Sequence, residues 1–298
     1  MIVNGVAIDD TFAEAFAMRG ARVIITAHTL AWARQAAVSM TGFATSVIGC
    51  GVEAGIEHEL SGGETPDGRP GVSVLLFATS SSELAKQLER RVGQCVLTSP
   101  TSAVFSGIAN GRPLPLGKTL RYFGDGHQVS KVIAGRRYWR VPVMDGEFIA
   151  EDTTAMSDAI GGGNFLILAA GTPQALSAAE AAIEAMRRLT GAIMPFPGGV
   201  VRSGSKVGSK YKTLIASTNH AFCPTLRGSV ESELGPGVEC VLEIVIDGLT
   251  EDAVRNSMQA GLRAVCAQGA AGGVRRLSAG NYGGKLGKFH FPLRALLP

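Results

Sequence analysis

The stretch Glu239-Cys240-Val241-Leu242-Glu243-Ile244-Val245-Ile246-Asp247 has the length and apolar character of a buried strand, with one carboxylate at its centre. Thr250 follows it as the predicted cap of a helix running to Cys266. The same order occurs earlier, where Gly71-Val72-Ser73-Val74-Leu75-Leu76-Phe77-Ala78-Thr79 precedes a helix capped by Ser80. The two stretches align residue for residue, which indicates two related structural units.

The segments around these two stretches extend the correspondence. In the first half we expect a helix over 11–19, in which Glu14 completes a capping box to Thr11, a strand over 22–27, a helix over 30–40, a strand over 43–50 and a buried strand over 72–78. In the second half we expect a strand over 165–170 and a helix from the N-cap Thr172 to Leu189. This order predicts an α+β fold of two ferredoxin-like lobes arising from an internal duplication, at residues 1–147 and 148–298. The alternative is coincidence between two generic α/β stretches.

Composition narrows the class of protein. Of 298 residues, 46% are hydrophobic and 18% charged, which excludes a disordered chain and favours an oligomer. The net charge of +3 comes from dispersed Lys and Arg, so nucleic-acid binding gains little support. The N-terminus lacks a signal-peptide pattern, and no apolar run reaches the roughly 20 residues of a membrane span. We therefore expect a cytoplasmic protein.

The metal-binding residue types are scattered. The five cysteines are never in CxxC spacing, and the five histidines form no HxH or HExxH pair. Reduced thiols and no intrinsic metal are expected. His220 and Cys223 lie in one polar loop, but Cys223 has no evident base partner and is not predicted to be a nucleophile.

Glu243 is the leading catalytic candidate because the two stretches act as an internal control. Its counterpart is Leu75, so the fold itself does not require a carboxylate at this position. A carboxylate in an apolar strand loses hydration, which raises its pKa and suits a general acid. The alternative is a glutamate at a solvent-facing or interface side, paired with Arg255 or Arg263.

Two glycine-rich loops of the second half are candidates for binding polyanions. Residues 203–210 (SGSKVGSK) combine backbone N–H groups, hydroxyls and lysines, whereas the alternative is a solvated surface loop. Residues 278–287 (SAGNYGGKLG) depart from the P-loop spacing, and Leu286 replaces the magnesium-binding Ser or Thr. ATP chemistry is therefore disfavoured.

A series of blocks spread along the whole chain resembles the formylmethanofuran:tetrahydromethanopterin formyltransferases. The blocks are Asn4-Gly5, 10–16 (DTFAEAF), 41–43 (TGF), 45–48 (TSVI), 64–72 (ETPDGRPGV), 93–96 (GQCV), 123–126 (FGDG), 146–149 (GEFI), 162–165 (GGNF), 195–199 (PFPGG), 205–210 (SKVGSK) and 278–281 (SAGN). Each block alone is weak, but in this order they are highly specific.

The resemblance implies a two-lobed ferredoxin-like fold, a dimer or tetramer, and an active site near a subunit interface. It also implies that a formyl group moves between N5 of tetrahydromethanopterin and the amine of a methanofuran-type carrier, as co-substrates, without a metal or redox cofactor. The resemblance further implies that Glu243 stands at the position of the family's catalytic carboxylate. This chain is mildly basic, with a sequence pI near 8.6, whereas methanogen members of the family are strongly acidic, so a bacterial one-carbon oxidation pathway is favoured over methanogenesis. For such a pathway the resemblance implies a place in a formyltransferase/hydrolase complex.

The remaining site predictions concern the carriers. Anionic tails of the carriers are assigned to Lys206, Lys210 and Lys285, and orienting polar contacts to Asn164, Asn219 and Asn281, with Ser205 as a further binding residue. Two rival functions stay open, a non-catalytic structural subunit of a one-carbon enzyme complex and an acyl- or formyltransferase that uses tetrahydrofolate.

Overall fold

The computed structural model describes residues 1–297, and the contacts within it divide into two compact units. Unit 1 combines Met1–Ala17 with the chain from Ile160 onward, and unit 2 is Met18–Ala159. These limits follow spatial contacts, so unit 1 is discontinuous in sequence. The division into lobes at residues 1–147 and 148–298 stays a prediction, because it cuts the chain at one point of the sequence whereas the units are defined by spatial contacts.

Unit 2 is built on strands that run in the spatial order β4-β5-β3-β6-β10-β9-β8. Their bounds are β4 Glu53–Leu60, β5 Gly71–Ala78, β3 Phe12–Thr26, β6 Ala103–Ser106, β10 Gly146–Glu151, β9 Arg136–Val143 and β8 Val129–Ile133, and β7 Arg112–Pro115 pairs with the start of β11 Thr153–Ala169. Among the first four strands of this order, each neighbouring pair is antiparallel. The helices are α1 Leu30–Thr41, α2 Val47–Cys50, α3 Ser81–Arg91 and α4 Gly117–Leu120.

The core of unit 2 lies between these strands and the helices α1 and α3. Val72, Val74 and Leu76 of β5 share that core with apolar residues of both helices. Because successive side chains of a strand alternate between faces, Ser73 and Leu75 point to the face opposite the helices. All eight residues of β5 are buried, so both of its faces are covered.

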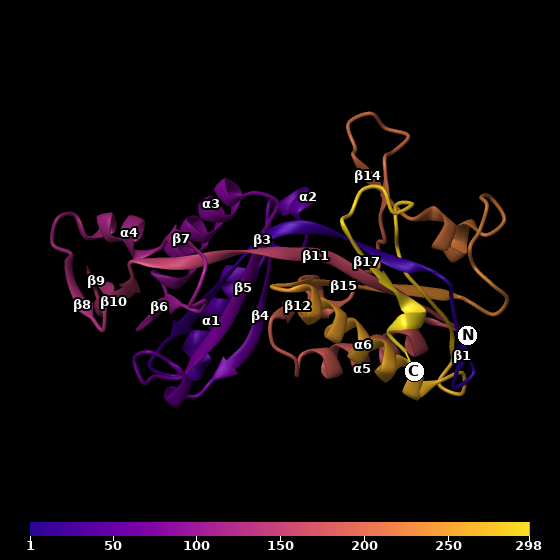
Figure 1. Cartoon of the computed structure of the whole chain (residues 1–298), viewed down its shortest axis with the longest axis horizontal. Helices are drawn as coiled ribbons and strands as arrows, with labels where there is room; N and C mark the ends of the chain where they lie inside the picture. The colour runs from indigo at the N-terminus through magenta and orange to yellow at the C-terminus, as the bar shows by residue number, and fades with distance from the viewer. Residues whose placement is uncertain (298) are drawn as a thin grey trace. The chain divides into compact units, whose positions relative to one another are not determined.

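Unit 1 has strands in the spatial order β1-β2-β16-β11, continued through β15 and β12. Their bounds are β1 Ile2–Val3, β2 Val6–Ile8, β16 Val274–Ser278, β15 Cys240–Gly248 and β12 Ala192–Ile193; β17 Phe289–Pro292 pairs with the first part of β3, and β13 Lys206–Val207 with β14 Ala216–Ser217. Helices α5 Thr172–Met186 and α6 Glu251–Gln268 lie side by side (Figure 1) and pack against Ile244 and Ile246 of β15.

The two units share one strand order. In unit 1 the neighbouring strands of the order β16-β11-β15-β12 are antiparallel. The antiparallel order β6-β3-β5-β4 of unit 2 matches it strand by strand. In the register, Glu243 lies opposite Leu166 of β11, and Leu75 lies opposite Arg22 of β3. Glu243 and Leu75 both point away from the helices of their unit, so they occupy matching positions in the two units.

The helix expected over 11–19 is wrong, because residues 12–19 lie in the fifteen-residue strand β3. The capping box proposed for Glu14 does not form; its carboxylate binds distant backbone N–H groups instead. Pairing with β17 at residues 12–15 holds this segment extended. Tertiary contacts therefore override the local helix signal.

The strand expected over 43–50 is also wrong. The side chain of Ser46 caps Ile48 N–H, and Gly51 ends the short helix α2 in the left-handed conformation, with φ 74°. The N-cap roles predicted for Ser80 and Thr250 are confirmed. Helix α5 is capped by Gly171 in place of Thr172 and ends at Met186.

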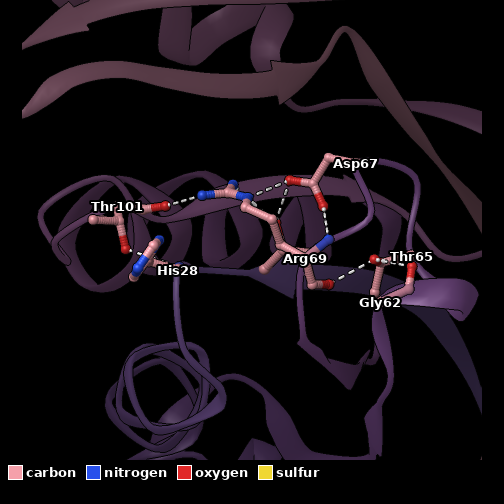
Figure 2. Close-up of polar contacts among 7 residues, drawn as sticks. His28, Gly62, Thr65, Asp67, Arg69 and Thr101 are labelled. Atoms are coloured by element: carbon pink, nitrogen blue, oxygen red, sulfur yellow. Dashed lines mark hydrogen bonds and ion pairs between the residues drawn. The ribbon is translucent and has the colours of Figure 1, made fainter.

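The turn-rich loop before β5 is closed by polar contacts within unit 2, as Figure 2 shows. Asp67 accepts hydrogen bonds from the hydroxyl of Thr26 at 2.7 Å and from Nε of Arg69 at 2.8 Å. Arg69 also donates to the carbonyl oxygen of Thr101, and Thr65 donates to that of Arg69. The block at residues 64–72 therefore stabilises the fold of unit 2 through these contacts.

Candidate functional site

A cavity of about 860 Å³ lies in unit 1, where the loops before β15 and after β16 approach the N-terminal residues. Six of the eight predicted site residues line it: Glu243, Asn164, Ser205, Lys206, Asn219 and Asn281. They come from strands β15 and β11, the hairpin β13–β14 with its flanking loops, and the loop after β16. The fold thus gathers residues separated by up to 117 positions of sequence, from Asn164 to Asn281, around one space.

Glu243 is fixed at mid-strand by its backbone. Its N–H and carbonyl oxygen both pair with Val201, at 2.9 and 2.8 Å, on the side of β15 away from the cross-strand neighbour Leu166. Within residues 1–297 no lysine or arginine forms an ion pair with its carboxylate, and Arg255 pairs with Glu251 instead. The alternative of a structural pair with Arg255 or Arg263 is therefore wrong.

Burial raises the pKa of Glu243 to about 7. The cause is loss of hydration beside apolar neighbours such as Leu166 and Val241, with no compensating cation. A carboxyl group with this pKa is present in both protonation states near neutral pH. It is therefore able to accept a proton and return it within one reaction cycle.

The two asparagines Asn164 and Asn281 are engaged in holding the loop after β16. Asn164 Oδ1 accepts from the N–H of Gly280 at 2.6 Å, and its Nδ2 donates to the carbonyl oxygen of the same glycine at 3.1 Å. Asn281 Nδ2 donates to the hydroxyl of Thr11 at 3.0 Å. Both amides therefore shape the cavity wall, whatever further contact they make with a ligand.

The loop at 278–287, which resembles a phosphate loop, already binds an anion of the protein. Glu14 is fully buried, and its carboxylate accepts four backbone N–H groups, from Tyr282 and Gly284 at 2.6 and 2.8 Å and from Leu286 and Gly287 at 2.7 and 2.6 Å. Although burial raises the pKa of Glu14, these hydrogen bonds lower it to about 2. The loop's donors are thus occupied, and Lys285 stands exposed outside the cavity.

Tyr282 also lines the cavity and was not singled out by the sequence. Its ring contacts that of Phe16, with centroids 5.8 Å apart, and its hydroxyl has Ser205 as a hydrogen-bond partner. Burial raises the pKa of Tyr282; the hydrogen bond with Ser205 opposes this rise, and the negative charges of Glu243 and Glu14 add to it by less. No sequence pattern marks this tyrosine, because its position depends on the buried Glu14.

The lysines divide by position. Lys206, in β13, lines the cavity, whereas Lys210 lies at the exposed end of the β13–β14 hairpin and does not line it. Two arginines also line the cavity: Arg276 lies 3.4 Å from Asp9, and Arg294 lies 3.0 Å from Asp10. These two arginines come from the second half of the chain and were missed because each is paired with the N-terminal segment.

Residues 1–297 contain no cluster of three or more His, Cys, Asp or Glu side chains able to hold a metal ion. The expectation of no intrinsic metal stays a prediction. No helix of this part of the chain is long and apolar enough to span a bilayer. The chemistry visible in the cavity is a carboxyl group that titrates near neutrality beside hydroxyl and amide groups, an arrangement suited to acid–base catalysis of acyl transfer.

Two family models together match almost the whole chain. The model described as formylmethanofuran-tetrahydromethanopterin formyltransferase matches residues 1–143, and the model of its proximal lobe matches residues 146–296. The formylmethanofuran–tetrahydromethanopterin formyltransferase of Methylococcus capsulatus is 68% identical over 297 residues, with 100% of both chains covered. One component of the formyltransferase/hydrolase complex of Methylorubrum extorquens is 54% identical over 301 residues, with 99% of this chain and 97% of that protein covered.

Solved structures give the same result. The formyltransferase/hydrolase complex of Methylorubrum extorquens, determined with methylofuran, matches with a TM-score of 0.98 at 53% identity over 100% of this chain and 99% of that chain. The formylmethanofuran:tetrahydromethanopterin formyltransferase of Methanosarcina barkeri matches with a TM-score of 0.94 at 49% identity, covering 99% of this chain and 100% of that chain.

Proposed function

Because this chain belongs to the formylmethanofuran–tetrahydromethanopterin formyltransferase family, we propose that it moves a formyl group between tetrahydromethanopterin N5 and the amine of a methanofuran-type carrier, with Glu243 as general acid and base. The observation that carries the role of Glu243 is a carboxyl group, placed in the cavity without a cation, whose pKa is about 7. The apolar residue at the matching position of unit 2, Leu75, supports a functional origin for this charge.

The reaction proceeds by addition and elimination. The acceptor amine attacks the formyl carbon, a C–N bond forms, and the carbonyl electron pair moves to oxygen. Glu243, as carboxylate, takes the proton released by the attacking amine and returns it to the donor nitrogen as the second C–N bond breaks. The carbonyl re-forms, and the enzyme regains its starting state without a covalent intermediate. Holding both carriers in one cavity supplies the orientation that the reaction needs.

The remaining cavity residues bind the carriers. Ser205, Asn219 and Lys206 line the cavity from the β13–β14 hairpin and its flanking loops, and Lys206 supplies the positive charge for an anionic tail. Asn164 and Asn281 act chiefly through the loop that they hold. Lys210 and Lys285, exposed and outside the cavity, contribute only if a carrier extends beyond it.

The fold and assembly follow the relatives. Each unit is a ferredoxin-like β-α-β-β-α-β domain, and the shared antiparallel strand order supports their origin by duplication. The chain occupies the place of the matching Methylorubrum component in a cytoplasmic formyltransferase/hydrolase assembly, as the 54% identity of the two proteins supports. Formation of a homo-oligomer belongs to the same proposal and is tested by mass measurement at working concentration.

The deciding experiment incubates the purified chain with formyl-tetrahydromethanopterin and a furan-amine acceptor and follows formation of the formylated amine. Glu243→Gln should lower kcat roughly 100-fold or more, because the amide does not exchange the proton. Glu239→Gln, which alters an exposed glutamate just before the same strand, is the matched control and should retain wild-type turnover. Inactive wild-type protein would favour a non-catalytic structural subunit. Turnover with formyl-tetrahydrofolate but not with formyl-tetrahydromethanopterin would favour a transferase that uses tetrahydrofolate.

A further inference from the structure

We propose that the hydroxyl of Tyr282 is a catalytic hydrogen-bond donor to the formyl oxygen, an inference that rests on the proposed formyl transfer. Addition of an amine to a formyl group places negative charge on this oxygen. A donor already oriented toward that position stabilises the charge without reorganisation during the reaction. Glu243 is committed to the amine protons, so the oxygen requires a different group.

The position of Tyr282 is fixed at two points away from its hydroxyl. Its backbone N–H donates to Oε2 of Glu14 at 2.6 Å, and its ring packs against Phe16 at 5.8 Å between centroids. The side chain lines the same cavity as Glu243 and Ser205. The hydroxyl is thereby held near the proposed acid–base group by contacts that a bound carrier does not need to displace.

The hydrogen-bonding capacity of the hydroxyl pair leaves one donor for a ligand. Ser205 and Tyr282 each carry one O–H, and the contact between them uses only one of the two. In residues 1–297 neither hydroxyl has another hydrogen-bond partner in the protein. One O–H therefore remains for an oxygen of a molecule in the cavity.

The electrostatic surroundings keep Tyr282 protonated. Burial raises its pKa most, the hydrogen bond with Ser205 lowers it, and the charges of Glu243 and Glu14 each raise it by less. A phenol with a raised pKa remains a donor at neutral pH and throughout the cycle. Two cavity groups thus divide the work: Glu243 exchanges protons with the amines, and Tyr282 donates a hydrogen bond but keeps its proton.

Glu14 has a different place in this arrangement. Its carboxylate binds the backbone of the loop and does not line the cavity described by residues 1–297. It is a positioning residue, acting on the reaction through Tyr282. The fully buried carboxylate therefore explains why the tyrosine stands in a fixed place although the loop contains four glycines.

The test replaces Tyr282 by Phe, which keeps the ring and its contact with Phe16. We expect kcat to fall about 100-fold with KM nearly unchanged, because the hydrogen bond strengthens only as the oxygen becomes charged. Tyr211→Phe, at an exposed tyrosine of the same unit, is the control and should match the wild type. A Tyr282→Phe enzyme with kcat within about twofold of wild type would overturn the proposal.

A second measurement does not depend on the folding of the Phe variant. Incorporation of 3,5-difluorotyrosine at position 282 keeps ring and hydroxyl but lowers the phenol pKa. The facing titratable groups, Glu243 and Glu14, are unchanged. The alkaline decline of kcat should move to lower pH, and an unmoved decline would contradict the proposal. Wild-type protein without formyl transfer would instead contradict the proposed function, so the two failures are distinct.

Discussion

In unit 2 the buried carboxylate of Glu57 meets a cation, whereas the carboxylate of Glu243 in unit 1 has no cationic partner within residues 1–297. Glu57 accepts hydrogen bonds from Nε and an Nη of Arg22 at 2.7 and 2.6 Å, and a third from the hydroxyl of Ser73 at 2.7 Å. At the position matching Arg22, unit 1 has Leu166. Loss of hydration at Glu243 is therefore unopposed, and its pKa rises to about 7.

The difference shows that the same strand order holds a compensated carboxylate in unit 2 and an uncompensated one in unit 1. In unit 2 the polar groups on the face away from the helices satisfy one another, so that face adds to the architecture. In unit 1 the corresponding face borders the cavity, where the carboxylate of Glu243 is able to bind a proton or a ligand. In the proposed mechanism, activity depends on the lack of a cationic partner at one position as well as on the presence of a glutamate.

The largest expected effect comes from giving unit 1 the residue of unit 2. Glu243→Leu should lower kcat about 1000-fold, equivalent to about 4 kcal/mol in the barrier. The same variant should be more stable than wild type by about 2 kcal/mol above pH 7, because it buries no carboxylate. Steady-state kinetics and urea unfolding of the purified proteins measure the two effects.

The pH dependence of that stability difference follows from the raised pKa of Glu243. Folded wild-type protein binds more protons than the unfolded chain between pH 4.5 and about 7, so its stability falls as pH rises through this interval. The difference between Glu243→Leu and wild type should therefore grow from pH 4.5 to 7 and then level. A difference independent of pH would place the carboxylate in water.

A smaller effect is expected from removing the compensated charge of unit 2. Glu57→Gln leaves the half-buried guanidinium of Arg22 beside a neutral amide and should destabilise unit 2 by about 3 kcal/mol. Hydrogen exchange of β4 and β5 measures this loss. Glu59→Gln, on an exposed residue of the same strand, is the control.

The pH profile of kcat should be the same in Glu57→Gln and wild-type protein, because the residues lining the cavity all belong to unit 1. A shifted profile would show that the two carboxylates are electrostatically coupled, contrary to the comparison.

The smallest effect concerns Glu14, which is satisfied by backbone groups in place of a cation. Glu14→Gln removes acceptors for the N–H groups of the loop and should cost about 2 kcal/mol. Amide exchange at Tyr282, Gly284, Leu286 and Gly287 should accelerate together. Unchanged exchange at these four amides would mean that the loop is held by other contacts.

The lowered pKa of Glu14 gives this contribution a defined pH range. The folded state keeps the carboxylate ionised down to about pH 2, while the unfolded chain binds the proton near pH 4.5. The stabilisation is fully present above pH 4.5 and is lost as pH falls toward 2. Wild-type protein should therefore lose more stability than Glu14→Gln over that interval, as followed by acid titration of the folded fraction.

Sequence patterns predicted the elements whose signals are local. The caps of α3 and α6 bind a backbone N–H three residues away, and the strands around Leu75 and Glu243 are marked by short apolar runs; the structure confirms both. The segment from residue 11 to 19 failed because its conformation depends on β17 and on a loop about 270 residues away. Local propensity contains no information about such partners.

The candidate site divides in the same way. Glu243 was predictable because an apolar strand with a single carboxylate is unusual within one short stretch. Tyr282 and Glu14 were not, since the sequence offers an ordinary loop tyrosine and an apparent helix cap. Lys210 and Lys285 carried the right charge in the right loops, but only coordinates separate a lysine at the cavity from one in solvent.

The four backbone N–H groups that bind Glu14 also determine how late in synthesis residues 1–17 are able to complete their contacts. Unit 2 is continuous in sequence, so its residues leave the ribosome as one block, and domains generally fold as units during synthesis. Residues 1–17 are translated before unit 2, yet the backbone donors that bind Glu14 do not exist until residue 287 has been translated. Residues 12–15 must therefore wait for their partner strand β17 while about 270 further residues are added. Until then the nascent chain lacks the loop that carries Tyr282.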